Sequence, residues 1–167
     1  MRYTSLLCLL VVLTFNSCGF YSFTGISIDE NVKTFQVNYF QNTATLIEPG
    51  IDRDFTLALQ DLIQNQTRLD LVTVNGDLVY EGEIVRYFVA PMTSTANNTA
   101  AESRLTIDVA VRFINNLNED DSFEQRFSFY FDYPGNNQLV GAQLDTAIDA
   151  IFERITQDIF NASLAKW

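Results

Sequence analysis

The sequence predicts an α+β two-layer sandwich, in which a mostly antiparallel sheet of about four or five strands is covered on one face by two helices. Three observations support this prediction. Two segments carry apolar residues at helical spacing, three long segments alternate apolar with polar residues, and the segments follow the order β-α-ββββ-α. Strands with one apolar face need helices with apolar faces to cover them, and this chain has both.

The first strand and the first helix are expected between residues 32 and 65. Phe35 and Val37 alternate with Gln36 and Asn38, so residues 32–40 are interpreted as a half-buried strand. Residues 51–65 follow with the spacing of an amphipathic helix. The apolar stripe of this helix consists of Ile51, Phe55, Ala58, Leu59, Leu62 and Ile63.

A β-hairpin is predicted next. Residues 69–74 have the composition of a short strand, and the Asn75-Gly76-Asp77 segment has that of a tight turn. Residues 77–90 then form a long strand. Gly82 interrupts the apolar phase of this strand, which predicts a bulge there. Pro91 is expected to end the strand.

Two further strands and a second helix complete the chain. Residues 104–114 and 123–132 alternate most clearly, and a polar hairpin loop over residues 115–121 joins them. Long strands joined by short or flexible loops predict an antiparallel meander. Residues 143–165 are interpreted as the second helix. The side chains expected to face the core from the two strands are Leu105, Ile107, Val109, Val111, Phe113, Phe123, Phe127, Phe129 and Phe131.

The N-terminus has the features of a bacterial lipoprotein signal. One positive charge precedes an apolar run of about ten residues, which is too short to span a bilayer. Ser17 then stands directly before Cys18. In such signals the chain is cut before the cysteine, whose thiol receives diacylglycerol and whose amine receives an acyl chain such as palmitate. Phe15 and Asn16 depart from the usual residues of this motif.

This interpretation divides the chain into three parts. Residues 1–17 would be a removed signal peptide, residues 18–31 a lipidated tether, and residues 32–167 a single domain. Cys18 would then hold the protein at a membrane, because one lipid chain anchors marginally and two or three anchor stably. The alternative is a plain secreted protein in which Cys18 is free or paired. The other cysteine, Cys8, would leave with the signal and could not pair with it.

Charge and composition exclude several functions. The chain has 21 acidic and ten basic residues, and loss of Arg2 with the signal would leave a net charge of −12. Such a balance disfavours nucleic acid and anionic lipid surfaces as partners. The sequence contains no histidine, so it can form neither a histidine-based catalytic triad nor a histidine metal site.

No catalytic constellation, metal site or cofactor site is predicted, and we do not expect an enzyme. Glu81 and Glu83 share a strand face and could act as an acid pair, but solvated or edge-guarding carboxylates explain them better. The Asn-Glu-Asp-Asp segment at residues 118–121 lacks the alternating ligands of a calcium loop.

Two surface features remain as candidate contacts. Arg104, Arg112 and Arg126 lie on the outward faces of the two clearest strands and could grip phosphate or carboxylate groups. The alternative is that they form cross-strand salt bridges with Asp108, Glu124 and Asp132. The small, polar loop over residues 92–103 could become ordered on a partner, or it could be a simple connection. Its candidate contact residues are Met92, Thr95, Asn97 and Asn98.

Two segments of the chain have a familiar sequence. They are the Cys-Gly-Phe-Tyr-Ser-Phe start at residues 18–23 and the Gly-Asp-Leu-Val-Tyr-Glu-Gly-Glu-Ile segment at residues 76–84, which precedes a Thr-rich loop. With these segments, the whole mature chain resembles the LptE family of lipopolysaccharide-assembly lipoproteins. The order of the predicted elements is also similar.

The resemblance implies a small α/β sandwich on the periplasmic side of the outer membrane. Such a protein would act as a plug and assembly partner inside the LptD β-barrel, which brings lipopolysaccharide to the cell surface. The basic residues that touch lipopolysaccharide in other members have no counterpart that a motif places here. The acidic balance favours the plug role over direct handling of lipopolysaccharide.

Three hypotheses therefore stand at this point. The first is the barrel-associated lipoprotein. The second is another non-catalytic outer-membrane lipoprotein that pilots a secreted complex or holds a small ligand. A closed apolar cavity under the helices would favour this second hypothesis. The third is a hydrolase that uses Glu81 and Glu83, and a deep pocket lined by both side chains would favour it.

Overall fold

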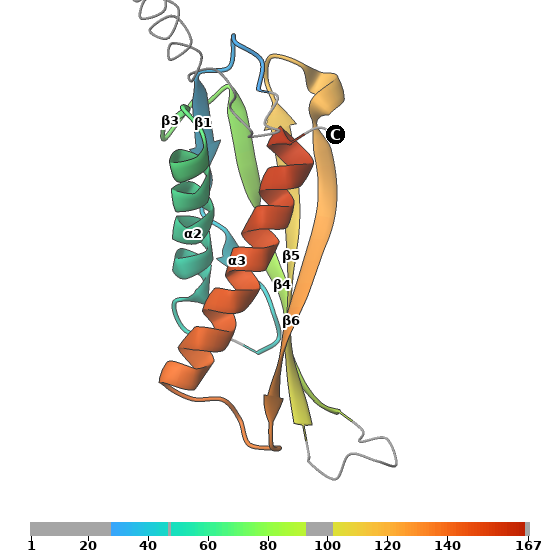
Figure 1. Cartoon of the computed structure of the whole chain (residues 1–167). Helices are drawn as coiled ribbons and strands as arrows, with labels where there is room; N and C mark the ends of the chain where they lie inside the picture. The colour runs from blue at the N-terminus through green and yellow to red at the C-terminus, as the bar shows by residue number, and fades with distance from the viewer. Residues whose placement is uncertain (1–27, 47, 93–101, 166–167) are drawn as a thin grey trace, which may run out of the picture.

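The structure, a computed structural model, describes residues 28–46, 48–92 and 102–165. These residues form one sheet with two helices lying against the same face of it (Figure 1). Along the chain, the elements are β1 (Thr34–Val37), β2 (Gln41–Asn42), α2 (Ile51–Gln66), β3 (Asp70–Leu71), β4 (Leu78–Met92), β5 (Glu102–Asn115), the 3-10 helix η1 (Glu119–Asp121), β6 (Phe123–Pro134) and α3 (Ala142–Leu164). The predicted α+β two-layer sandwich is confirmed.

The sheet is mixed. Its order is β3-β1-β4-β5-β6, and the short β2 pairs with β4 beyond the end of β1. The three long strands β4, β5 and β6 form the predicted antiparallel meander. By contrast, β1, β2 and β3 are joined to their neighbours by parallel pairing. The predicted strand over residues 32–40 is therefore correct in its centre, but the regular pairing of β1 covers only four residues.

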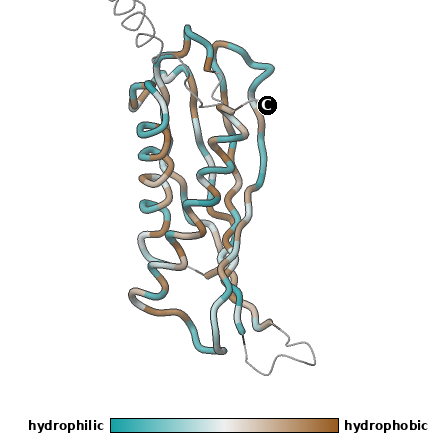
Figure 2. The backbone as a smooth tube through the Cα atoms, in the orientation of Figure 1, coloured by the Kyte–Doolittle hydropathy of each residue, from teal (hydrophilic) through white to brown (hydrophobic). Residues whose placement is uncertain are grey.

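Both helices bury the faces that their sequences predict. Apolar and polar residues alternate along the helices and the long strands (Figure 2). The contact between the layers centres on Phe55 of α2, whose ring packs edge-on against Phe40 and Phe152, with 5.0 Å between ring centroids in each case. Phe152 belongs to α3, so these three rings join the start of the sheet to both helices. Burying each phenylalanine stabilises the fold by about 1.5–3 kcal/mol.

The predicted hairpin at Asn75-Gly76-Asp77 is wrong. β3 and β4 lie on opposite sides of β1, so that Phe35 is in register with Leu71 on one side and Leu78 on the other. The linking segment crosses β1 instead of folding back on β3. Asn75 has a positive φ of 55°, but Gly76 does not, so the turn type that Asn-Gly favours in hairpins is not formed.

Gly76 is needed for a different reason than the one predicted. A Cβ at this position would lie 2.8 Å from the Cβ of Gln36, because the crossing segment rests directly on β1. Only a residue without a side chain allows this close approach. The helix α2 causes the arrangement, since a strand-helix-strand crossover brings β3 parallel to β1.

Two details of β4 also correct the sequence interpretation. The bulge lies between Ile84 and Arg86, and not at Gly82. Gly82 pairs regularly with Val111, but a Cβ there would collide with the carbonyl oxygen of Ala110 and lie 2.7 Å from the ring of Phe40. Pro91 does not end the strand and pairs with Ser103. The sheet tolerates this proline because β4 has no neighbour on its other side at this level in the described residues.

Asp77 fixes the start of β4 against the start of β1. Its carboxylate accepts hydrogen bonds from the backbone N–H groups of Lys33 and Thr34 and from the Thr34 hydroxyl, each 2.9 Å long. The Thr34 hydroxyl also accepts a hydrogen bond from the Asp77 N–H at 3.0 Å. Since backbone donors favour the charged form, the pKa of Asp77 lies below its ordinary value.

We predict that Gly82→Ala destabilises the protein by about 3 kcal/mol, because neither the Ala110 backbone nor the Phe40 ring can move freely. Urea unfolding followed by circular dichroism measures the change. Glu83→Ala on the same strand is the control and should change stability by about 0.5 kcal/mol or less. Equal stability of the two variants would show that the packing above Gly82 is loose.

We also predict that Asp77→Asn lowers stability by about 1–2 kcal/mol at pH 7, since hydrogen bonds to a charged group are lost. The pKa of Asp77 is lower in the folded protein than in the unfolded chain. The unfolded chain therefore binds more protons than the folded protein as pH falls. The contribution of Asp77 is therefore complete above about pH 5 and disappears as pH falls through its folded pKa. The difference between wild type and variant should shrink between pH 7 and pH 3 in urea titrations. Asp70→Asn, an exposed control, should change stability at pH 7 by about 0.5 kcal/mol or less.

Candidate functional site

The face of the sheet that points away from the helices is the candidate functional surface, and we call it the open face. It is formed by alternate residues of β4, β5 and β6, whose other residues point into the core. In β5, Leu105, Ile107 and Val109 are completely buried, as predicted. The cross-strand rows of the open face, read from β4 through β5 to β6, are Glu81–Arg112–Glu124, Glu83–Ala110–Arg126, Arg86–Asp108–Ser128, Phe88–Thr106–Tyr130 and Ala90–Arg104–Asp132.

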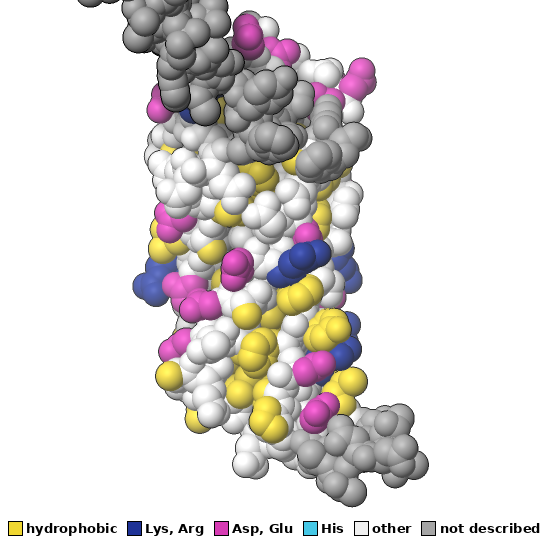
Figure 3. Space-filling view, in the orientation of Figure 1, with side chains coloured by type: hydrophobic (Ala, Val, Ile, Leu, Met, Phe, Trp, Pro, Cys, Tyr) yellow, Lys and Arg dark blue, Asp and Glu magenta, His cyan; other side chains and the backbone are white. Residues whose placement is uncertain are grey.

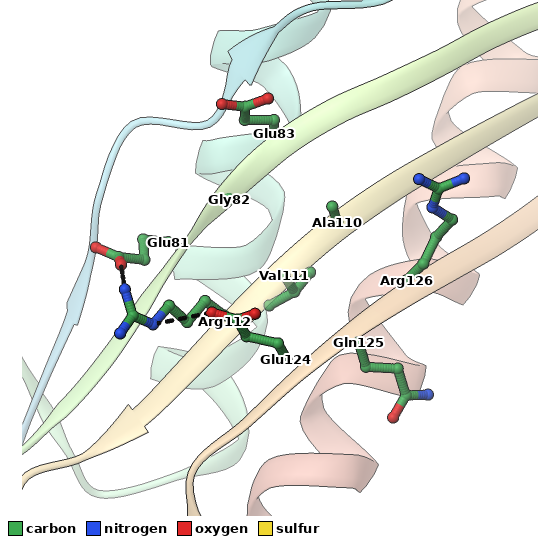
Figure 4. A pocket seen from close by; sticks show the side chains of 9 residues that line it. All are labelled: Glu81, Gly82, Glu83, Ala110, Val111, Arg112, Glu124, Gln125 and Arg126. Atoms are coloured by element: carbon green, nitrogen blue, oxygen red, sulfur yellow. Dashed lines mark hydrogen bonds and ion pairs between the residues drawn. The ribbon is translucent and has the colours of Figure 1, made fainter.

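An open groove of about 550 Å³ lies across the first two of these rows (Figure 4). The small side chain of Ala110 leaves space between the longer side chains of β4 and β6. On one side, Arg112 bridges Glu81 at 3.4 Å and Glu124 at 3.3 Å. On the other side, Arg126 forms no ion pair with any described residue within 4 Å. At one end of the groove the arginine is therefore paired with two carboxylates, and at the other end the arginine has no ion pair among the described residues.

The two carboxylates that could have served a hydrolase line this groove but are engaged in structural contacts. Glu81 pairs with Arg112 and accepts a hydrogen bond from Asn38 at 3.1 Å. Glu83 accepts a hydrogen bond from Thr43 at 3.2 Å. The groove is a shallow surface feature, and neither carboxylate lies in an enclosed pocket.

The structure does not bring the three candidate arginines together. Arg112 and Arg126 are neighbours beside the groove, whereas Arg104 is six residues along β5 from Ala110, which corresponds to about 20 Å. Arg104 binds Asp132 through two hydrogen bonds of 2.7 and 2.8 Å. This contact lowers the pKa of Asp132 and raises that of Arg104. Arg126 alone among the three has its guanidinium available for another anion.

Sequence analysis misses two residues of β4 on the open face, Arg86 and Phe88. Phe88 and Tyr130 flank Thr106 in one row and are 44% and 45% exposed. An arginine lies over each ring: the Arg86 guanidinium is 4.8 Å from the centre of Phe88, and that of Arg104 is 3.6 Å from the centre of Tyr130. We call Arg86, Phe88, Arg104 and Tyr130 the aromatic–arginine patch. Only the position of the bulge before Arg86 could have revealed that Arg86 and Phe88 belong to this patch.

Asp108 is the acidic centre next to this patch. Its side chain is almost completely buried, although it belongs to the open face, and it accepts a 2.6 Å hydrogen bond from the Ser128 hydroxyl. Arg86 lies 3.9 Å away on the adjacent strand. Two of the expected cross-strand salt bridges therefore form, Arg104 with Asp132 and Arg112 with Glu124. Asp108 pairs instead with Arg86 of β4.

The other predicted contacts are only partly described. Met92 is the last residue of β4, pairs with Glu102 and is 37% exposed. Thr95, Asn97 and Asn98 lie outside the described residues, and so does Cys18. Within the described ranges, no group of three metal-ligating side chains comes together, and no helix is long and apolar enough to span a membrane.

The helix face differs from the open face. Acidic side chains are spread over it, and hydrophobic side chains gather in its lower half in Figure 3. Two acidic residues of α2, Asp52 and Asp54, lie near the start of that helix, where the helix dipole favours negative charge. The open face carries a more even mixture of charge.

Several solved structures are similar to this chain. They include a minor lipoprotein from Acinetobacter baumannii (14% identity, 77% of this chain and 89% of that chain covered, TM-score 0.44) and rare lipoprotein B from Shewanella oneidensis (13%, 76% and 89%, 0.44). A PelC dodecamer from Paraburkholderia phytofirmans is also similar (8%, 84% and 95%, 0.49). The sequence has no match among curated proteins.

A protein-family model provides the decisive comparison. The model of LptE, described as lipopolysaccharide-assembly, matches residues 32–163, a range that covers nearly all of the helices and strands described above. The match confirms the resemblance seen in the sequence and places the chain among non-catalytic lipoproteins. The protein is a member of the LptE family.

Proposed function

We propose that this protein is an outer-membrane lipoprotein that acts as a plug and assembly partner of an LptD-like β-barrel during lipopolysaccharide transport to the cell surface. The observation that carries this proposal is the family match over nearly the whole described domain. A lipid on Cys18 would hold the protein on the periplasmic side of the membrane. No catalytic step is required, because the protein would act by its shape and its surface.

The open face is the surface that we assign to the barrel. Interfaces are rich in tyrosine, phenylalanine and arginine, and such residues carry most of the binding energy. The aromatic–arginine patch supplies these residue types on a rigid sheet, and the arginines are already held by acidic neighbours. Little side-chain entropy would be lost when a partner covers them.

The tether would separate the anchor from the docking body. Residues 18–31 span at most about 50 Å when fully extended. This length would let the domain reach into a barrel lumen while the lipid remains in the membrane.

Direct contact with lipopolysaccharide is the less supported part of the proposal. Lipopolysaccharide is anionic, and this chain has a net charge of −11. Arg104 and Arg112 are held by carboxylates, so Arg126 is the candidate that remains for an anionic group. A single exposed arginine supports a minor contact and not a binding site of its own.

The alternative is a lipoprotein that pilots another complex or holds a small ligand. Ligand sites are usually enclosed, mostly apolar cavities. The groove on the open face is shallow and lined largely by charged side chains. The barrel partnership therefore fits this surface better than a small ligand does.

We predict that Phe88→Asp combined with Tyr130→Asp reduces co-purification of the barrel from outer membranes at least tenfold, because the patch would lose its apolar area. Quantitative immunoblotting of the barrel after pull-down of the full-length lipoprotein measures this. Leu57→Asp is the matched control, since Leu57 is 47% exposed but lies on α2. Unchanged recovery with the double variant would exclude the open face, and wild-type recovery without any large β-barrel protein would exclude the proposed function.

We predict that Cys18→Ser leaves the fold intact and moves the protein from the membrane fraction to the soluble fraction. Fractionation after high-salt washing and circular dichroism of the released protein measure these two outcomes. The lipid anchor is disproved if the variant still sediments with membranes through the wash.

A further inference from the structure

The segment that crosses β1 between β3 and β4 contains the only Asn-Gly pair of the chain, Asn75-Gly76. Such a pair is chemically labile, because glycine has no side chain to shield its amide nitrogen from the preceding asparagine. The Asn75 side chain is exposed, whereas Gly76 is buried against β1. The reactive side chain therefore lies in solvent, while the nitrogen that would attack it lies inside the fold.

The reaction of an Asn-Gly pair is a deamidation. The Gly76 amide nitrogen loses its proton to hydroxide and attacks Cγ of Asn75, and the side-chain nitrogen leaves as ammonia. Water then opens the five-membered succinimide at either of its carbonyl groups. The product is aspartate or isoaspartate, and in isoaspartate the backbone runs through the side-chain carbon. One water is consumed and one ammonia is released, so no oxidant, reductant or enzyme is required.

Hydrogen bonds on both sides of Gly76 fix the attacking nitrogen. The Gly76 N–H donates to Gln36 Oε1 at 3.3 Å, so its proton is engaged by β1. Gln36 is itself oriented, because its Nε2 donates to Asn38 Oδ1 at 2.7 Å. On the other side, Asn116 Nδ2 donates to the Gly76 carbonyl at 2.8 Å. The Gly76 nitrogen therefore has to leave these partners before it can turn towards Asn75.

We propose that Asn75 is a latent deamidation site that the fold keeps unmodified, and that Gln36 is the residue that shields it. Gln36 takes no part in the chemistry and acts only by holding the N–H of Gly76. Deamidation then proceeds from states in which the crossing segment has left β1. The rate of modification at Asn75 therefore measures how often this part of the sheet opens.

Isoaspartate at this position would prevent the crossing segment from closing again. It adds one methylene to the backbone directly before Gly76, where even a Cβ would lie 2.8 Å from Cβ of Gln36 and 2.9 Å from its backbone nitrogen. Asp77 follows at once, and its carboxylate binds the N–H groups of Lys33 and Thr34. The lengthened segment would displace Asp77, so the start of β4 would lose its attachment to β1.

Peptide mass spectrometry of the full-length lipoprotein tests the shielding. The tryptic fragment of residues 69–86 contains Asn75 as its only side-chain amide, so replacement of NH by O in its mass identifies the reaction at this residue. The protein is incubated in detergent at mildly alkaline pH, once folded and once unfolded in urea. We expect the folded chain to deamidate at least about tenfold more slowly, because opening of the segment has to precede the reaction.

Two substitutions of Gln36 separate shielding from a general effect on the fold. Gln36→Ala removes the acceptor of the Gly76 N–H and should raise the rate in the folded protein at least about fivefold, because the crossing segment opens more easily. Gln36→Glu keeps an acceptor oxygen on a side chain of the same length and should retain the wild-type rate. Circular dichroism shows whether each variant is folded.

A variant at a different residue keeps the proposal testable if Gln36→Ala fails to fold. Asn116→Ala changes an exposed residue, frees the Gly76 carbonyl and should also raise the rate. Asn118→Ala is the matched control, since Asn118 is an exposed asparagine of the same loop that bonds to Asn115 and Asp121. Its rate should equal that of the wild type.

The pattern of rates decides the proposal. A slow reaction in the wild type and in Gln36→Glu, with a faster one in the folded Gln36→Ala or Asn116→Ala chain, supports it. Three results would each overturn it: a folded wild-type chain that reacts as fast as the unfolded one, a folded Gln36→Ala or Asn116→Ala chain that reacts at the wild-type rate, or a folded Gln36→Glu chain that reacts as fast as Gln36→Ala. Recovery of a barrel partner affects none of these results.

Discussion

Phe55 packs between Phe40 and Phe152, and this contact holds both helices on one face of the sheet. Phe40 belongs to the chain between β1 and β2, so the three rings fix the first part of the sheet to both helices at once. The backbone N–H of Phe40 donates to the Thr56 hydroxyl at 3.1 Å, which holds the ring at the correct depth. Gly82 allows the ring to lie directly against β4. Both helices are thereby bound to one face of the sheet, and the open face remains available.

The sequence predicts well the elements whose apolar residues keep one helical or strand period without interruption. α2 and α3 begin and end within about two residues of their predicted bounds, and β5 buries the five side chains expected of it. The hairpin at Asn75 could not be predicted correctly, because the same residues fit a two-residue turn and a crossing over β1. What decides between them is the crossover made by α2, which depends on contacts distant in sequence.

The candidate site is harder to predict from the sequence, because its contacts also depend on residues distant in the chain. Arg104 and Arg112 were identified on the correct face, since β5 keeps its phase throughout. Their ion pairs with Asp132, Glu124 and Glu81 depend on the register between strands, which a single sequence does not contain. Phe88 and Arg86 were missed altogether. The bulge after Ile84 shifts the remainder of β4 by one residue and turns both side chains to the open face.

One-sided packing also explains why the surface of this protein, and not a pocket, is the feature to test. A sheet covered on both faces would hide its polar rows. Here the helices cover one face only, and the polar rows lie on the other. Among their residues, Asp108 is almost buried. Its contacts with Ser128 and Arg86 stiffen the row next to Phe88 and Tyr130. The aromatic side chains therefore stand on a backbone that is already rigid. A partner that covers them would gain contact area without first ordering the surface, which is the property that a plug requires.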